Sequence, residues 1–174
     1  VILRELARAL DERPRPDVVT LAGSGEPTLY RSLGALVHRI RSLTLLPVVL
    51  LTGGGTLMFD DVAAEAVTVD VLAPSLDAAS QEQFAAINRP CGEIRFQRMV
   101  DGLTRTLARF QGSTRLEVML VPGVNDEQGS LESIAALTRG MQLSAIDLNT
   151  PVRPPQAPGI EVASTELLNK AIAA

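Results

Sequence analysis

The chain has 174 residues, of which 46 % are hydrophobic and 21 % charged, and 16 basic against 20 acidic residues give a formal net charge of −4. This length and composition fit one ordinary hydrophobic core and therefore one domain. Aromatic residues make up only 3 % and Trp is absent, which argues against a general nucleic-acid binder, because such proteins combine a basic surface with aromatic side chains for base stacking.

Short apolar runs alternate along the chain with segments of helical periodicity. In chain order the pattern predicts a helix over 3–10, a strand over 17–22, a helix over 28–43, a strand over 47–52, a helix over 60–67, a strand over 69–75, helices over 80–87 and 94–110, a strand over 115–121, a helix around 131–137 and a strand over 145–149. The proline-rich segment 151–158 is expected to be irregular. Ser164 is the expected N-cap of a last helix that reaches Ala174.

The predicted fold class is α/β with parallel strands. Strands that are apolar throughout are typical of a sheet covered on both faces. Regular alternation of strands and helices predicts right-handed crossovers between parallel strands. Either a doubly wound sheet or a partial (βα) barrel fits this pattern, and both place ligands at the carboxyl ends of the strands.

Each predicted strand is followed by glycine, proline or small polar residues. The segments are 23–28 (GSGEPT), 52–56 (TGGGT), 74–78 (PSLDA), 122–126 (PGVND) and 149–153 (NTPVR). Each can be explained alone as a turn or a helix cap, and Ser80 with Gln83 predicts a capping box near the third. Because all carboxyl ends of a parallel sheet meet at one edge, the five segments together favour a shared binding site.

Other side chains narrow the possible chemistry. Arg89 lies beside a proline in the loop 87–90 (INRP), where a guanidinium suits a carboxylate or a phosphate. Cys91 is the only cysteine and His38 the only histidine. This excludes an internal disulfide and a metal site of several thiolates from this chain, and it argues against a Ser–His–acid hydrolase.

The sequence has no apolar run of ~20 residues, the length that a membrane-spanning helix needs, and no signal-peptide pattern. We therefore expect a cytoplasmic protein without a membrane partner.

These segments, in this order, resemble the radical S-adenosylmethionine (SAM) iron–sulfur oxidoreductases, and most closely the group related to the wybutosine-synthesis enzymes. Segment 23–29 is similar to the GGE element of that family, and 74–78, 87–90, 121–126 and 148–155 follow in the family's order. Family members usually carry Leu-Thr-Asn-Gly where this chain has LTGGG at 51–55. The resemblance covers almost the whole chain.

The resemblance implies a partial (βα) barrel that binds SAM and a [4Fe–4S] cluster. In such enzymes the reduced cluster cleaves SAM to a 5′-deoxyadenosyl radical, which abstracts hydrogen from a substrate. The cofactor contacts that it implies here are Gly23, Ser24, Gly25 and Glu26 for the methionine ammonium, Thr52 beside them, Ser75 and Asp77 near the ribose, Arg89 for the methionine carboxylate, and Asn125 and Asn149 near adenine.

The family binds its cluster through three cysteines spaced CxxxCxxC, and this chain has no such motif. We therefore expect residues 1–174 to form one truncated radical SAM core domain of five βα units. Its first βα unit and its cluster ligands would lie outside the chain, which would hold no metal ligand and be inactive alone. The family also implies an electron donor such as a flavodoxin or ferredoxin, and the resemblance assigns no substrate.

Two alternatives are kept. The first is a non-catalytic βα-barrel module that binds SAM or a nucleotide, or docks onto a partner chain. The second is a βα-barrel enzyme of phosphate chemistry, which predicts a lysine or paired carboxylates among the strand-end loops. The second is less favoured, because the only lysine, Lys170, lies in the last predicted helix.

Overall fold

The computed structural model describes residues 1–12, 16–152 and 160–174. It contains a sheet of five strands, which are β1 (Val19–Leu21), β2 (Val48–Thr52), β3 (Val71–Pro74), β4 (Ser113–Met119) and β5 (Ala145–Asn149). All five predicted strands are therefore present, with β5 at its predicted bounds. Most of the predicted irregular segment 151–158 lies outside the described residues.

Helices follow or precede the strands as the periodicity predicts. They are α1 (Ile2–Asp11), α2 (Leu33–Arg41), α3 (Asp60–Ala66), α4 (Gln81–Ile87), α5 (Phe96–Arg109), α6 (Gln128–Thr138) and α7 (Thr165–Ile172), with two short 3-10 helices, η1 (Pro27–Leu29) and η2 (Gly55–Met58). Ser164 caps α7 by accepting a hydrogen bond from the Leu167 N–H at 3.1 Å. Among the described helices, none combines the length and the apolar composition that a membrane crossing requires.

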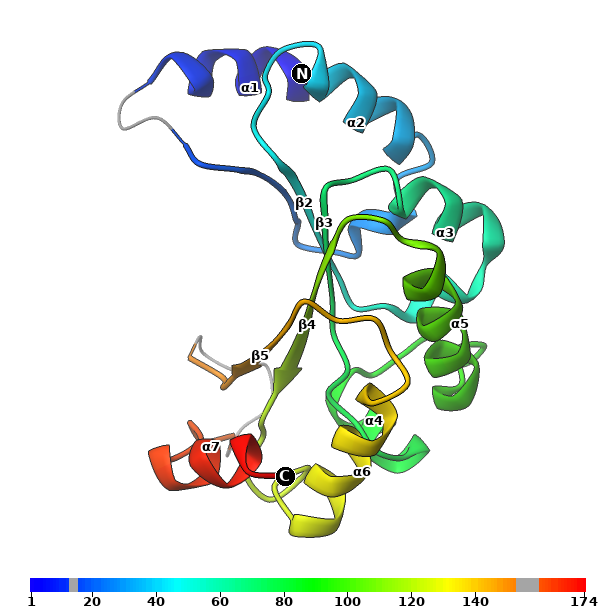
Figure 1. Ribbon diagram of the computed structural model, residues 1–174, viewed down its shortest axis with the longest axis vertical. Helices are drawn as coiled ribbons and strands as arrows, with labels where there is room; N and C mark the ends of the chain where they lie inside the picture. The colour runs from blue at the N-terminus through cyan, green and yellow to red at the C-terminus, as the bar shows by residue number, and fades with distance from the viewer. Residues whose placement is uncertain (13–15, 153–159) are drawn as a thin grey trace.

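The strand order distinguishes between the two architectures that the sequence left open. Neighbouring strands follow the order β1-β2-β3-β4-β5, and every pair is parallel. A doubly wound sheet reverses its order at a switch point, whereas a βα barrel adds each new strand on the same side. In Figure 1 helices α2 to α6 lie along one side of the sheet, as the outer layer of a barrel does. The fold is thus a partial βα barrel.

Two local differences from the predicted elements concern the segments after β1 and β2. The helix predicted over 28–43 is divided into η1 and α2, because the Glu26 carboxylate holds Thr28 and the chain turns at Tyr30 before α2 begins. The helix η2 was not predicted. It starts directly after Gly54, whose positive φ of 75° suits a residue without Cβ.

The face of the sheet opposite helices α2 to α6 is more exposed to solvent than we expect for strands that are apolar throughout. In β4 the buried residues Leu116 and Val118 alternate with Arg115, which is exposed, and Glu117, which is half-buried. Arg115 forms a two-pronged ion pair with Asp147 of β5, with N–O distances of 2.9 and 2.6 Å. The expectation of a sheet buried on both faces is therefore wrong for β4, where period-two alternation was visible in the sequence.

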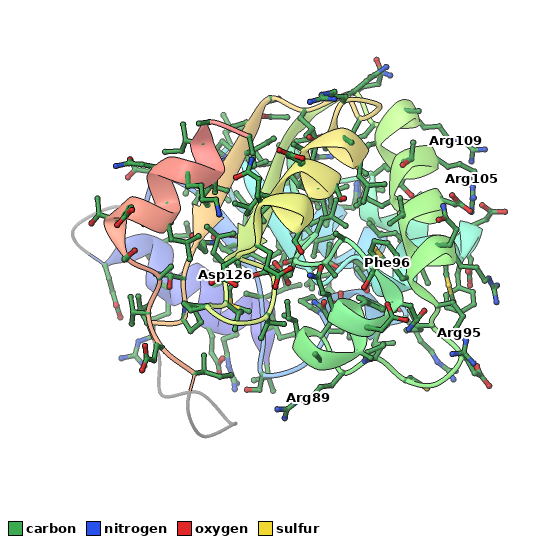
Figure 2. The ribbon with its side chains drawn as sticks, turned by 90° about the horizontal axis from the view of Figure 1, so that it is seen from below. Arg89, Arg95, Phe96, Arg105, Arg109 and Asp126 are labelled. Carbon is green, nitrogen blue, oxygen red and sulfur yellow. The ribbon has the colours of Figure 1, made fainter. Side chains whose placement is uncertain are left out.

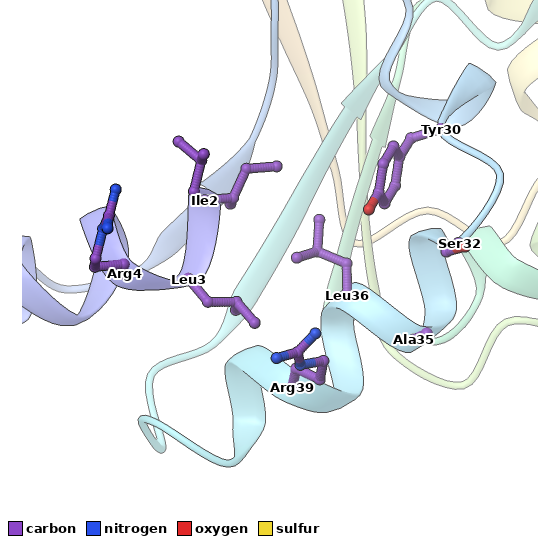
Figure 3. Close-up of a pocket in the computed structure, with 9 residues that line it drawn as sticks. Ile2, Leu3, Arg4, Tyr30, Ser32, Ala35, Leu36 and Arg39 are labelled. Carbon is purple, nitrogen blue, oxygen red and sulfur yellow. The ribbon is translucent and has the colours of Figure 1, made fainter.

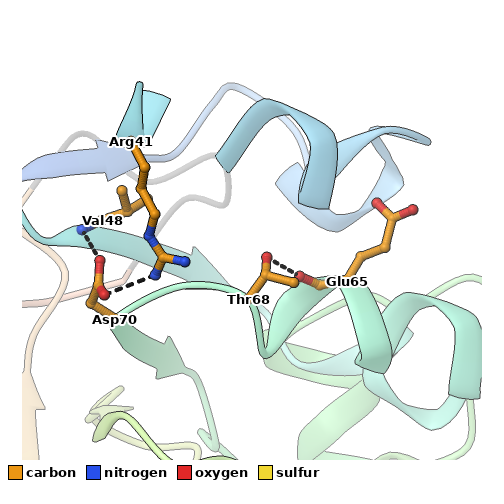
Figure 4. Close-up of polar contacts among 5 residues, drawn as sticks. All are labelled: Arg41, Val48, Glu65, Thr68 and Asp70. Atoms are coloured by element: carbon orange, nitrogen blue, oxygen red, sulfur yellow. Dashed lines mark hydrogen bonds and ion pairs between the residues drawn. The ribbon is translucent and has the colours of Figure 1, made fainter. Parts of the chain in front are cut away.

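At the opposite end of the sheet from the strand-end loops, Asp70 fixes how β2 and β3 begin. Its carboxylate accepts hydrogen bonds from the Val48 N–H and from the Arg41 guanidinium, both at 2.8 Å (Figure 4). Nearby, the Thr68 hydroxyl donates to the Glu65 carbonyl at 2.6 Å and closes α3. These contacts tie α2, β2 and β3 together, and so help set the positions at which the strands end.

The core lies between the sheet and its helices. Most of its largest fully buried side chains come from β2, β3, β4, α2 and α5, among them Leu50, Leu72, Leu103 and Leu116. Helix α5 packs on η2, and Gly102 lies against Met58 of η2. A Cβ on Gly102 would lie 2.4 Å from the Met58 Cα.

Candidate functional site

Hydrogen bonds join the loop after β1 to the ends of β2 and β3. The Thr52 hydroxyl donates to Glu26 Oε1 at 2.7 Å, and the Ser75 N–H donates to the Thr52 carbonyl at 3.0 Å. Glu26, Thr52 and Ser75, which lie 26 and 23 residues apart in the sequence, are therefore neighbours in the fold.

The same pattern continues to the ends of β4 and β5. The Met119 N–H donates to Asp77 Oδ1 at 2.8 Å, and the Leu120 N–H donates to the Asn149 carbonyl at 2.8 Å. The loops and strand ends from Glu26 to Asn149 thus form one hydrogen-bonded line, which we call the carboxyl edge. The sequence-based expectation that these segments meet at one edge of the sheet agrees with this geometry.

Glu26 is the most heavily bonded carboxylate of the carboxyl edge. Its Oε1 accepts from the Thr28 N–H at 3.1 Å and the Thr28 hydroxyl at 2.6 Å, in addition to Thr52, and its Oε2 accepts from the Gly53 N–H at 2.8 Å. The Thr28 hydroxyl is in turn hydrogen-bonded to that of Thr56. Sequence reasoning identified Glu26 and Thr52 but missed the two further threonines, whose only signal was their place beside the glycine-rich turns.

The glycine-rich turns lie at the surface beside Glu26. Gly23, Ser24 and Gly25 are all exposed. A Cβ at Gly25 would meet nothing within 4 Å. Backbone groups of this turn are therefore open to approach from solvent, as the prediction of a ligand contact requires, and the contact itself stays a prediction.

Asp77 is a buried carboxylate between β3 and β4. It is 6 % exposed, and it accepts from Met119 through Oδ1 and from the Asn88 side-chain amide through Oδ2, the latter at 3.0 Å. Burial raises the pKa of Asp77 above its ordinary 3.8, the two hydrogen bonds act in the opposite direction, and the charge of Glu117 adds to the rise. Both oxygens are thus engaged within the protein.

The raised pKa of Asp77 predicts a dependence of stability on pH. The folded chain binds this proton more tightly than the unfolded chain, so wild type should gain stability relative to Asp77→Asn as pH falls through the folded pKa towards 3.8. The gain should be at most about 1.4 kcal/mol per pH unit. Urea unfolding of both proteins from pH 7 to pH 4 measures it, and parallel curves would contradict it.

Arg89 and Asn149 are exposed, and Ser75 is half-buried. Figure 2 shows Arg89 projecting from the protein body into solvent. Arg89 is placed beside the carboxyl edge because Asn88, its neighbour, is bonded to Asp77. The contacts of Arg89, Ser75 and Asn149 with a cofactor stay predictions.

Asn125 is fully buried, at 0 % exposure, and binds three backbone groups. Its Oδ1 accepts from the Val121 N–H at 2.7 Å, and its amide N–H groups donate to the carbonyls of Asp77 at 2.7 Å and Met119 at 2.8 Å. The amide therefore holds the loop after β4 against the loop after β3. A contact of Asn125 with adenine is not among these interactions and stays a prediction.

The chain offers no donor set for an iron–sulfur cluster. Cys91, the only cysteine of the sequence, is exposed. Within the ranges that the structure describes, no group of three or more His, Cys, Asp or Glu side chains could hold a metal ion. A cluster held by three thiolates does not fit these residues.

A separate groove of about 670 Å³ lies between the start of α1 and α2. Figure 3 shows its apolar floor, with Leu3, Tyr30 and Leu36, and Arg4 and Arg39 at its margins. None of the predicted cofactor contacts lines it, so the groove is not the site that the sequence predicts.

Comparison with known families supports the resemblance. The family model described as the radical SAM superfamily matches residues 1–132. The chain is 29 % identical over 169 residues to a UPF0026 protein of Helicobacter pylori, covering 96 % of this chain and 54 % of that protein. A UPF0026 protein of Synechocystis is 30 % identical over 154 residues, covering 88 % and 56 %. A protein named GTPase Obg from Brachyspira hyodysenteriae is 36 % identical over 152 residues, covering 87 % and 22 %.

Solved structures share the fold. A radical SAM methyltransferase from Sphaerobacter thermophilus superimposes with a TM-score of 0.71 at 22 % identity, over 99 % of this chain and 51 % of that one. TYW1 with a lysine-pyruvate adduct bound gives a TM-score of 0.73 at 19 % identity, over 98 % and 56 %. The chain thus spans about half the length of the UPF0026 relatives and about a fifth of the protein named GTPase Obg.

Proposed function

The chain belongs to the radical SAM superfamily, and from this premise we propose that its carboxyl edge binds S-adenosylmethionine. It is related to the UPF0026 proteins. The observation that carries the proposal is the hydrogen-bonded line from Glu26 to Asn149, which gathers carboxylate, hydroxyl and open backbone groups at the end of the sheet where βα folds bind ligands.

The groups at the carboxyl edge suit the polar parts of SAM. Its ammonium needs acceptors, and Glu26 Oε2 accepts one hydrogen bond within the described chain, from Gly53, although a carboxylate oxygen can accept two. Its carboxylate needs donors, and the Arg89 guanidinium offers a planar pair of N–H groups. The bound molecule would supply a sulfonium-activated adenosyl group, and the residues named here would bind and orient it.

The same proposal limits what the chain does alone. Because one cysteine cannot supply three thiolates, no step through a [4Fe–4S] cluster is derived for these residues. We propose that the chain binds SAM without cleaving it, as the cofactor-binding part of a radical SAM enzyme. An electron donor such as a flavodoxin or ferredoxin is proposed only for a complete enzyme that contains this domain.

Isothermal calorimetry with SAM tests the binding. We expect micromolar binding by the iron-free chain, and a loss of roughly tenfold or more for Glu26→Gln, because one charged hydrogen bond is removed. Glu65→Gln is the matched control, since Glu65 also accepts a backbone N–H, that of Gly34 at 3.1 Å, outside the carboxyl edge. Absence of binding by the wild type would refute the proposal.

Anaerobic reconstitution with iron and sulfide tests the second part. We expect no stoichiometric cluster by absorbance and iron analysis, and no 5′-deoxyadenosine after addition of reductant and SAM. A stoichiometric [4Fe–4S] centre on this chain would refute the proposal that it binds SAM without holding a cluster of its own.

A further inference from the structure

The loop after α4 contains a backbone conformation that costs energy. Arg89 has a φ of 45°, and it is the only non-glycine residue with positive φ in the described part of the chain. Such conformations are uncommon for residues with a Cβ, and the following Pro90 would ordinarily favour an extended backbone instead. Strained residues of this kind persist where surrounding contacts enforce them, and they cluster at functional sites.

Asn88, the residue before Arg89, has a hydrogen-bond partner for its side-chain amide nitrogen but not for its side-chain oxygen among the described residues. Its amide N–H donates to Asp77 Oδ2 at 3.0 Å. Its Oδ1 is buried and has no hydrogen-bond partner among the described residues. Leaving a buried acceptor unpaired is unfavourable. The loop therefore adopts this geometry despite two energetic costs at consecutive residues, the unpaired oxygen of Asn88 and the positive φ of Arg89.

Asp77 links this loop to the sheet. Its other oxygen accepts from the Met119 N–H at the end of β4, and its carbonyl accepts from the buried Asn125. The loop that carries Arg89 is therefore anchored through Asn88 and Asp77 to the end of β4 and to Asn125. Each carboxylate oxygen of Asp77 accepts one hydrogen bond from the protein, and the contact of Asp77 with a ribose stays a prediction.

We propose that Asp77 and Asn88 form a positioning pair, which holds the backbone of Arg89 in its left-handed conformation and presents the guanidinium at the carboxyl edge to the carboxylate of a small ligand. This inference rests on the proposed function for the identity of that ligand, the carboxylate of SAM. Arg89 is exposed, no ion pair joins it to another residue of the described ranges, and it projects outward in Figure 2. A two-pronged interaction with a carboxylate requires a fixed guanidinium, because both N–H groups must be aligned.

Cys91 provides a probe of the loop that does not depend on any ligand. It is the only cysteine, it is exposed and it lies two residues from Arg89. With a nitroxide label on Cys91, we expect a motionally restricted electron paramagnetic resonance spectrum for the wild type and a markedly more mobile one for Asn88→Ala and Asp77→Ala. Asn88→Ser and Asp77→Asn are the milder variants, and circular dichroism checks that each variant is folded.

The control removes an amide hydrogen bond outside the loop. Gln97→Ala deletes the bond from Gln97 to Asp101 on the surface of α5, which measures 2.9 Å, and it should leave the spectrum unchanged. If folded Asn88→Ser and Asn88→Ala both give the wild-type spectrum, the positioning pair is refuted, whatever the chain binds.

The ligand arm compares SAM with decarboxylated SAM by calorimetry on the unlabelled chain. We expect the wild type to bind SAM roughly tenfold or more tightly than the decarboxylated compound. Arg89→Lys and Asn88→Ser should bring that ratio towards one while leaving the affinity for decarboxylated SAM unchanged. If Arg89 and Asn88 had purely structural roles, these variants would lower the affinity for SAM and for decarboxylated SAM by the same factor.

The possible failures are distinguishable. If the wild type binds both compounds equally, Arg89 does not take the carboxylate and the inference fails, although the proposed function stands. If it binds neither, the proposed function fails, and the spectrum of the labelled loop still decides whether Asp77 and Asn88 position Arg89.

Discussion

Replacing Gly102 by alanine is expected to lower the free energy of unfolding by about 2–3 kcal/mol, the upper part of the usual range for overpacking. The added Cβ would lie 2.4 Å from the Met58 Cα and 2.7 Å from its nitrogen, both backbone atoms of η2. Because backbone cannot swing aside as a side chain can, α5 and η2 must separate. The gain in helix propensity, about 1 kcal/mol, offsets the clash only in part.

Thermal and urea unfolding measure this effect, and a fall of the Tm on the order of 5–10 °C is expected for a chain of this size. Gly129→Ala is the matched control, because Gly129 also lies in a helix but a Cβ there meets nothing within 4 Å. Its stability should be unchanged or slightly raised. Equal stability of Gly102→Ala and wild type would mean that α5 does not approach η2 this closely in solution.

Replacing Asn125 by alanine is expected to cost about 3–5 kcal/mol, because it leaves a buried N–H, a buried carbonyl and a half-buried carbonyl without their partner, each near the lower end of the about 1–3 kcal/mol that an unpaired group costs. The groups belong to Val121, Asp77 and Met119. This loss is large beside the 5–15 kcal/mol by which domains are typically stable. Urea unfolding followed by circular dichroism measures it.

Two further variants test the cause of that loss. Asn125→Asp keeps the shape and the acceptor for Val121 but turns an oxygen towards two carbonyls, so its stability should rise as pH falls and the new carboxyl is protonated. Asn149→Ala removes an exposed amide at the same edge and should change stability by no more than about 0.5 kcal/mol. A mild effect of Asn125→Ala would show that water replaces the amide readily.

The sequence predicted the strands and their shared edge because both follow from local patterns. Apolar runs of strand length and the turn residues behind them are visible without tertiary contacts, and the parallel direction of the strands follows from their alternation with helices. Ser164 could likewise be recognised as an N-cap from its position alone. The strand order, which excludes a doubly wound sheet, came from the structure.

The role of Asn125 could not be predicted in the same way. Its three partners are Asp77 after β3, Met119 at the end of β4 and Val121 after β4, and they meet only after β3 and β4 have paired. The sequence could therefore show a polar loop residue but not its complete burial. The strain at Arg89 was equally invisible, because a residue before proline is expected to be extended. The open face of β4 is a different case, since the alternation of Arg115 and Glu117 with apolar neighbours was there to be read.

The consecutive strand order has a consequence for evolution. When each strand pairs with the one that follows it in the chain, the sheet is modular, and further βα units can be appended at either margin without changing the register of the existing ones.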